Sequence, residues 1–398
     1  MREAKDSFRT TTIEVNPSDY YCMFCRQLIV EQSEKTLDFQ ICPECTKVLG
    51  LEFQEGLDDP VEIKTIQSLS SLLNAPPLPP IALDSFSGTH NQPFFIYTTN
   101  ERHVNGLFIN NASFSALPSE ICKFTSLEIL FVYNSKLKKF PSELNQLHSL
   151  RKISLKNNQL STLPALTDGL SSLEYLNLEN NEIEFLPSEL EPLQSLTFLS
   201  LKNNCLADLP TTLNQLVSLR YLNLRGNQLT SLPDTLTDLT QLHFLFLSSN
   251  WLTSLPSNLP SMVRLRAIDL DNNLLEVIPS CVTGLGSLEG LTISNNQLRH
   301  TPLHYEGLEN LRFLFLDHNK LQEFSTCGLD NLEVLSITNN NLVAIPTCLE
   351  QNSQLYLIDL RENQPLGSKS CQIGCLDDKR EGIRRVRQFC GENTSHGT

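Results

Sequence analysis

The sequence lacks any apolar run long enough to cross a membrane. No stretch approaches the roughly twenty apolar residues that a spanning helix needs, and residues 1–15 contain no run of signal-peptide length. It also lacks an excess of basic residues, since 30 Lys and Arg stand against 45 Asp and Glu. The net charge of −15 disfavours nonspecific binding to nucleic acid or to an anionic membrane. We therefore expect a cytoplasmic protein without membrane insertion and without a nucleic-acid partner.

The signatures of several enzyme classes are missing as well. The chain contains no G-x-x-x-x-G-K phosphate loop, no H-E-x-x-H pair and no G-x-S-x-G elbow. With 40% apolar and 19% charged residues, the 398-residue chain has the composition of a folded protein, long enough for one large unit and a small module. We expect no enzyme, no catalytic residues and no small-molecule substrate.

Most of the chain is an internal repeat with leucine at fixed positions. The unit reads L-x-x-L-x-L-x-x-N-x-L, followed by a second half that often contains Leu-Pro. Units start every 23 residues from Val104 to Leu311. The unit at Leu311 has 21 residues, and two more start at Leu332 and Leu355. Twelve repeats therefore run from 104 to about 366.

This pattern resembles the leucine-rich-repeat family, and its Leu-Pro step resembles the intracellular Ras-suppressor and Scribble-like class. The resemblance implies an α/β fold: a solenoid in the shape of a horseshoe, with a parallel sheet on its concave side. It also implies a surface for a protein partner. Proline at the start of the convex segment limits that side to short turns, so we expect little regular α-helix there.

Alternation along each short strand predicts which side chains face the core. The fourth and sixth positions point inward, as for Leu176 and Leu178 in one repeat. Asparagine fills the ninth position of ten repeats, where a buried amide can donate to and accept from the turning backbone. These residues are Asn158, Asn181, Asn204, Asn227, Asn250, Asn273, Asn296, Asn319, Asn340 and Asn363. We interpret them as a structural ladder, which the first two repeats interrupt with Ala112 and Ser135.

Two Cys-x-x-Cys pairs lie near the N-terminus, with sixteen residues between them. They are Cys22, Cys25, Cys42 and Cys45. This spacing is typical of a tetrahedral thiolate zinc site, and four thiolates leave no position open for water or substrate. We therefore expect zinc as a structural cofactor; a redox pair is disfavoured because no βαβ context surrounds it. The segments CMFC and ICPEC resemble the zinc domain of Clp-type unfoldase ATPases and, more generally, zinc ribbons.

The sequence divides into four segments. They are a zinc module at 1–56, a linker at 57–93, the repeat solenoid at 94–366, and a C-terminal cap and tail at 367–398. In the linker, Asp59, Pro60 and Glu62 predict a helix start, and the proline-rich residues 74–80 predict an extended spacer. The helix should bury one apolar face, made of Ile63, Ile66, Leu69 and Leu73. Residues 94–109 predict a strand, a polar turn and the first repeat strand.

An aromatic column marks the predicted concave face. The third position of each repeat points out of the sheet, where no leucine core claims it. This column contains Tyr175, Phe198, Tyr221, Phe244 and Phe313, and the fifth position adds Phe246 and Phe315. Trp251, the only tryptophan, occupies a tenth position. Exposed aromatic patches are typical of interfaces, so we predict that these residues bind the partner. The alternative is a ladder of rings that only covers the floor of the groove.

Charge flanks this column unevenly. The basic residues lie mainly toward its N-terminal side and are Arg151, Lys152, Lys156, Lys202, Arg220 and Arg225. Acidic residues follow it, namely Asp269, Asp271, Glu289 and Asp317. A partner should therefore present an apolar ridge between an acidic and a basic end.

These features favour a scaffold or adaptor that binds a protein on the concave face and docks elsewhere through its zinc module. The alternative is an accessory subunit, or a ubiquitin-ligase-like signalling protein whose zinc module recruits an enzyme. A RING domain needs eight ligands, however, and only four thiols are clustered. Cys375 and Asp377 match the Cys-x-Asp of bacterial ligases with leucine-rich repeats, but fewer than forty residues follow the last repeat. Residues 1–60 carry six basic and twelve acidic residues, which argues against nucleic-acid binding.

Five further cysteines lie toward the C-terminal end. Cys371, Cys375 and Cys390 cluster at the predicted cap, and Cys327 and Cys348 should lie near each other on the convex side. A second metal site at the first three is the alternative, although a Cys-x-x-x-Cys spacing is unusual for one. We predict that these thiols are free and reduced.

Overall fold

A computed structural model describes residues 57, 59–73, 94–100, 102–164, 168–302, 305, 307–349 and 352–364. The chain divides into two compact units, Met1–Ser135 and Lys136–Thr398. The predicted zinc ligands and the cysteines of the predicted cap lie outside the described residues; they are Cys22, Cys25, Cys42, Cys45, Cys371, Cys375 and Cys390.

The first unit contains the predicted hairpin and the first two repeat strands. β1 (Phe94–Asn100) pairs antiparallel with β2 (His103–Asn110), and β2 pairs parallel with β3 (Ile129–Tyr133). A short 3₁₀ helix, η2 (Ser119–Lys123), lies between β2 and β3. The register of the hairpin shifts after Thr98, opposite Gly106. A Cβ atom at position 106 would lie 2.3 Å from Oγ1 of Thr98, so a larger residue would displace this hydroxyl, which donates to Oδ1 of Asn105 at 2.8 Å.

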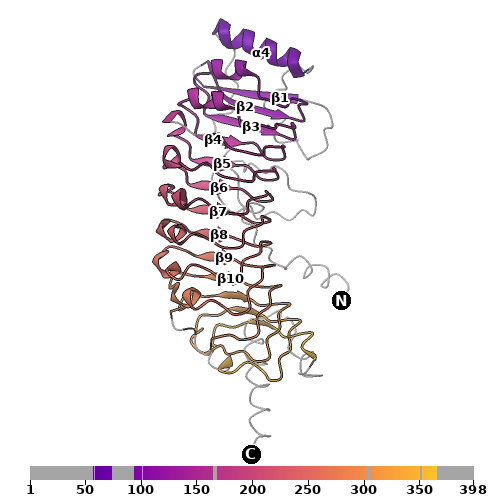
Figure 1. Ribbon diagram of the computed structural model, residues 1–398, viewed down its shortest axis with the longest axis vertical. Coiled ribbons are helices and arrows are strands. Elements are labelled where there is room, and N and C mark those ends of the chain that lie inside the picture. Colours follow the sequence, from indigo (N-terminus) through magenta and orange to yellow (C-terminus); the bar gives the residue numbers. More distant parts are fainter. Residues whose placement is uncertain are drawn as a thin grey trace, which may run out of the picture. The chain divides into compact units, whose positions relative to one another are not determined.

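The linker helix, α4 (Pro60–Leu73), forms where the sequence predicts it (Figure 1). Asp59 caps it, because its Oδ1 accepts the backbone N–H of Val61 at 2.7 Å. The predicted apolar face is wrong in part, since Ile63 is 38% exposed. The buried positions are Glu62, Thr65, Ile66 and Leu69. Glu62 replaces Ile63 in the buried face because its Oε2 accepts the backbone N–H of Val104 at 3.0 Å.

The second unit contains a parallel sheet whose strands follow one another in chain order (Figure 1). Each strand pairs with the next at equivalent repeat positions. The strands are β4 (Lys152–Ser154), β5 (Tyr175–Asn177), β6 (Phe198–Ser200), β7 (Tyr221–Asn223), β8 (Phe244–Phe246), β9 (Ala267–Asp269), β10 (Gly290–Thr292), β11 (Phe313–Phe315), β12 (Val334–Ser336) and β13 (Leu357–Asp359). The leucines at the fourth and sixth positions are buried as predicted; Leu176 and Leu178 are 2% and 0% exposed.

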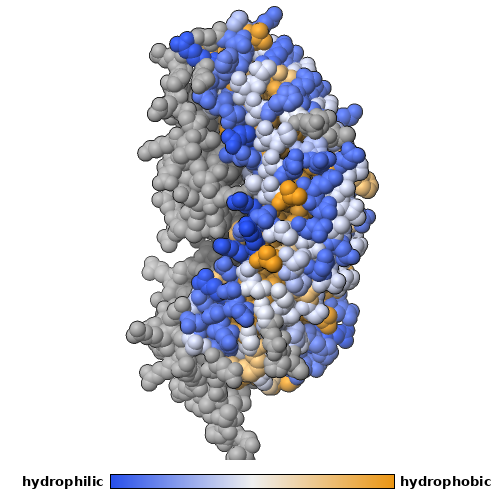
Figure 2. Space-filling view, turned by 90° about the vertical axis from the view of Figure 1, so that its left-hand side faces the viewer, coloured by the Kyte–Doolittle hydropathy of each residue, from blue (hydrophilic) through white to orange (hydrophobic). Residues whose placement is uncertain are grey.

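Short 3₁₀ helices occupy the opposite side of the repeats. They are η3 (Ser142–Gln146), η4 (Asp168–Leu170), η5 (Glu191–Leu193), η6 (Thr211–Gln215), η7 (Asp234–Asp238), η8 (Leu259–Ser261) and η9 (Ser280–Gly284). A proline precedes η3, η6, η7 and η9 directly. The described repeats contain no α-helix, as expected from those prolines. On the side that carries the 3₁₀ helices, hydrophilic residues prevail and hydrophobic ones form separate spots (Figure 2).

The asparagine ladder is confirmed. Nδ2 of Asn204 donates to the carbonyls of Leu178 at 3.0 Å and Leu201 at 2.9 Å, and its Oδ1 accepts the N–H of Ile183 at 3.0 Å. One amide thus joins two successive coils. In the first unit, where this position is Ser135, its Oγ accepts the backbone N–H of Ala112 at 3.2 Å.

The residue before each ladder position adopts a left-handed backbone, which the sequence analysis missed. Asparagine fills most of these positions, and Gly226 has a φ of 66°. Both residue types tolerate this conformation, so the recurring Asn-Asn pairs in the sequence indicate a left-handed residue before the ladder asparagine. The other residues at this position of the second unit are Asn157, Asn180, Asn203, Ser249, Asn272, Asn295, His318, Asn339 and Glu362.

Candidate functional site

The outer surface of the parallel sheet, here called the sheet face, carries the third and fifth positions of each repeat. The fourth-position side chains are buried beneath it, so the third and fifth positions point to the other side of each strand. This is the surface that the sequence predicts as concave and partner-binding.

The structure brings five of the predicted aromatic side chains together on the sheet face. Tyr175 stacks on Phe198 with ring centroids 4.4 Å apart, and Phe198 stacks on Tyr221 at 4.3 Å. Phe246 lies 5.3 Å from Tyr221, and Phe244 lies 6.4 Å from it. Phe198, Tyr221 and Phe246 are buried, whereas Tyr175 and Phe244 are only partly buried. Mutual stacking therefore hides much of this column, and its two ends offer most of its accessible surface.

The remaining predicted aromatic residues lie apart from this cluster. Phe313 and Phe315 belong to β11, three strands along from β8, and both are partly buried. The guanidinium of Arg312 lies 5.2 Å above the Phe313 ring. Trp251 lies beyond the end of β8 and is 52% exposed.

Acidic neighbours partly neutralise the predicted basic side. Arg151 forms an ion pair with Glu174 at 2.6 Å, one coil further on. Lys156 likewise pairs with Glu179 at 3.4 Å. Lys152 is partly buried on β4. Exposed pairs such as the first contribute little to stability, but they reduce the net positive potential of this end.

Three carboxylates occupy the acidic side of the sheet face: Asp269, Asp271 and Asp317. Their hydrogen-bond donors are hydroxyls and backbone N–H groups. Asp269 accepts from Ser248 Oγ at 2.5 Å and from Thr292 Oγ1 at 3.0 Å. Asp271 accepts from the N–H of Ser294 at 2.6 Å, and Asp317 accepts from Ser336 Oγ at 2.5 Å. Burial and the neighbouring charges of Asp269 and Asp317 raise the pKa of Asp271 to about 7, against the effect of these hydrogen bonds. The acidic side therefore changes its charge near neutral pH.

Comparisons with known families agree with this architecture. Residues 148–192 and 194–239 match a family model described as two copies of leucine-rich repeats, and residues 256–321 match a second leucine-rich-repeat model. The fold is that of a leucine-rich-repeat solenoid. The Ras-suppressor and Scribble-like class stays a prediction, as does the zinc module. No curated protein sequence matches the chain significantly.

Solved leucine-rich-repeat structures share the fold. A leucine-rich-repeat protein of Leptospira interrogans is 26% identical, with a TM-score of 0.52, covering 85% of this chain and 99% of its own. The functional domain of InlJ from Listeria monocytogenes is 22% identical, with a TM-score of 0.56, covering 68% of this chain and 57% of its own. A chain of the Drosophila Toll–Spatzle complex is 25% identical, with a TM-score of 0.52, covering 61% of this chain and 37% of its own.

Two of the remaining cysteines are not free, contrary to the prediction. Cys327 and Cys348 form a disulfide, with Cα atoms 5.2 Å apart. They occupy the same position in the successive repeats that start at Leu311 and Leu332. Equivalent positions of adjacent coils lie side by side, which brings the two thiols within bonding range despite a separation of 21 residues.

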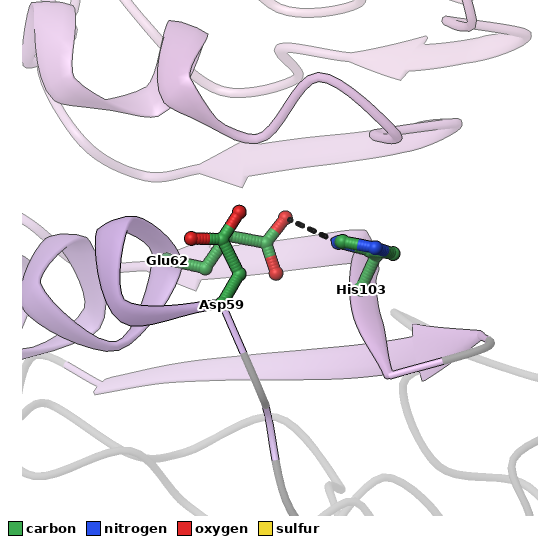
Figure 3. A group of neighbouring side chains, drawn as sticks. All are labelled: Asp59, Glu62 and His103. Carbon is green, nitrogen blue, oxygen red and sulfur yellow. Dashed lines mark ion pairs between the residues drawn. The ribbon is translucent and has the colours of Figure 1, made fainter.

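A second cluster of polar side chains lies in the first unit, where α4 meets the start of β2 (Figure 3). Potential ligand atoms of Asp59, Glu62 and His103 lie within 4.8 Å of one another. Nδ1 of His103 is 3.6 Å from Oε1 of Glu62, whose side chain is 1% exposed. Burial raises the pKa of Glu62, while its hydrogen bond from Val104 and the charge of His103 lower it.

Both carboxylates of this cluster already have structural roles. Asp59 caps the helix, and Glu62 accepts a hydrogen bond from the backbone of β2. We therefore interpret the cluster as the anchor of α4. The sequence pattern does not reveal this cluster, because Glu62 and His103 are 41 residues apart and belong to no repeat. Among the described residues, no helix is long and apolar enough to span a membrane.

Proposed function

We propose that this protein is a non-enzymatic scaffold that binds a protein partner along the sheet face of its repeats. The carrying observation is that Tyr175, Phe244, Phe313 and Phe315 keep accessible aromatic surface there, outside the leucine core. Proteins with leucine-rich repeats commonly serve as interaction scaffolds, and one similar chain was solved as part of the Toll–Spatzle complex. Partly exposed aromatic residues are frequent binding hot spots.

The predicted four-cysteine module at 1–56 completes this proposal as a zinc-bearing docking unit. Its donor set of four thiolates suits zinc, which would hold a module too small to fold on its own core. The alternative of a ubiquitin-ligase-like protein rests on the same module.

The cytoplasmic location also stays a prediction. The disulfide of Cys327 and Cys348 weighs against it, because structural disulfides persist mainly in oxidising compartments.

A comparison of two matched double variants tests the binding face. Affinity capture with quantitative mass spectrometry would use three proteins. They are the full chain, the double variant Phe244→Ala with Phe313→Ala, and the double variant Val217→Ala with Val263→Ala. Val217 and Val263 are 56% and 63% exposed and follow η6 and η8, away from the sheet face. A partner enriched by the parent should be lost with the phenylalanine variant and kept with the valine variant. The reverse pattern would place the partner on the other side.

A further inference from the structure

The third-position column on the sheet face is interrupted over two strands. β9 and β10 have Ala267 and Gly290 there, whereas β8 and β11 have Phe244 and Phe313. Among the described residues, a Cβ atom added at Gly290 would have only Cβ of Ala267 within 4 Å, at 3.9 Å. A Cβ atom therefore has room above Gly290. Because strands lie about 4.8 Å apart, Phe244 and Phe313 stand about 14 Å apart across this space, which we call the Ala267–Gly290 gap.

The two ends of the gap are aromatic. Phe244 and Phe246 bound it on the β8 side, and Phe313 and Phe315 on the β11 side. The faces of such rings attract cations, and guanidinium groups in particular. On the β11 side, the guanidinium of Arg312 already makes such a cation–π contact with the Phe313 ring.

The long edges of the gap differ in charge. One edge carries Arg266 and Glu289, whose side chains lie 3.8 Å apart and offset each other. The other edge carries Asp269, Asp271 and Asp317. Among the described residues, no lysine or arginine forms an ion pair with these three carboxylates, whose partners are hydroxyls and N–H groups. The gap therefore lies between aromatic residues, with carboxylates along one side that no described lysine or arginine neutralises.

We propose that the Ala267–Gly290 gap receives an arginine side chain of the protein partner. A guanidinium is planar, stacks on an aromatic ring and donates to carboxylates in a fixed fork, so it matches the aromatic wall on β8 and the acidic edge. A neutral apolar side chain would leave the carboxylates without a counter-charge, and an acidic one would be repelled by them. This inference rests on the proposed function and specifies the chemistry of the partner.

Isothermal titration of the full chain with capped tripeptides tests the gap directly. The probe is acetyl-Gly-Arg-Gly-amide, and its control is the same peptide with citrulline, which has nearly the shape of arginine but no charge. We expect the arginine peptide to bind about tenfold more tightly, because only its charged guanidinium can pair with the carboxylates. At pH 8, where Asp271 is mostly ionised, Asp271→Asn should remove part of this difference.

Gly290→Phe fills the gap and should abolish binding of the arginine peptide. The backbone at position 290 accepts a side chain, because an added Cβ meets only an ordinary contact and the φ of Gly290 is not left-handed. Gly286→Phe, at an exposed position before β10 where an added Cβ would meet only the carbonyl oxygen of Gly307 at 3.7 Å, is the matched control and should bind as the parent does. Equal binding of the two peptides to the parent, or unchanged binding by Gly290→Phe, would overturn the inference. A captured partner lost with the Phe244 and Phe313 variant but kept with Gly290→Phe would overturn it too, while the proposed function would stand.

Discussion

The rings of Phe198 and Tyr221 stack with centroids 4.3 Å apart and planes 9° from parallel. Tyr221 is only 4% exposed, and it also lies against Phe246. Its ring thus covers the floor of the sheet face and stabilises the stack more than it offers surface to a partner. Tyr221→Ala should lower the free energy of unfolding by about 3 kcal/mol, measured by urea denaturation.

The matched control for this prediction is Tyr221→Phe, which keeps the ring. The substitution removes only the hydroxyl, which accepts from Nδ2 of Asn223 at 3.4 Å, so it should lower the stability less than alanine does. If the alanine and phenylalanine variants were equally stable, the column would be held by the leucine core alone.

The zinc content of the protein tests the predicted four-cysteine module. Protein purified without chelator should contain close to one zinc ion per chain by elemental analysis, bound through Cys22, Cys25, Cys42 and Cys45. Cys22→Ser with Cys45→Ser should lose it, because two thiolates cannot complete a tetrahedral site. Cys205→Ser, in the repeats, is the control and should retain the metal. A parent protein without zinc, or a double variant that keeps it, would contradict the predicted module.

The disulfide of Cys327 and Cys348 makes a prediction about the last repeats. Each coil of a solenoid is stabilised by its neighbours, so the terminal coils are the first to open. A bridge across 21 residues should stabilise the oxidised protein by about 3 kcal/mol. A reductant should therefore lower the melting temperature of the parent to the value of the double variant Cys327→Ser with Cys348→Ser. The melting temperature of the double variant should not change with the reductant. If the two thiols of native protein were already open to alkylation without a reductant, the bridge would be absent.

The repeats could be predicted from the sequence because each coil poses the same physical problem. Every strand must bury its fourth- and sixth-position leucines, and every turn must satisfy the same backbone groups. Asn204 does this through hydrogen bonds to two coils, and the ninth position therefore recurs as asparagine. The helix start at Asp59 was equally local, since capping depends on only a few adjacent residues.

What the sequence could not provide depended on contacts between distant residues. Ile63 fits the apolar spacing of α4, yet Glu62 is the buried residue, because an N–H group on β2 needs an acceptor. Nothing near Glu62 in the sequence records that need. The burial of Phe198 and Tyr221 likewise depends on how the rings of successive coils stack, and alternation alone only shows on which side of the strand they lie.

The acidic edge of the sheet face should make stability depend on pH. The pKa of Asp271 is about 7 in the folded protein and 3.8 as the ordinary value, so folding favours its protonated form. The resulting stabilisation of the folded state is complete below about pH 4 and is lost as the pH rises through 7. Replacement by asparagine keeps an oxygen that can accept the N–H of Ser294 but removes the charge that Asp269 and Asp317 repel. Between pH 5 and pH 8, by urea denaturation, the parent should therefore lose about 2 kcal/mol more stability than Asp271→Asn. The exposed control Asp208→Asn should follow the parent, and an Asp271→Asn variant with the same pH profile as the parent would assign the charge change to another group.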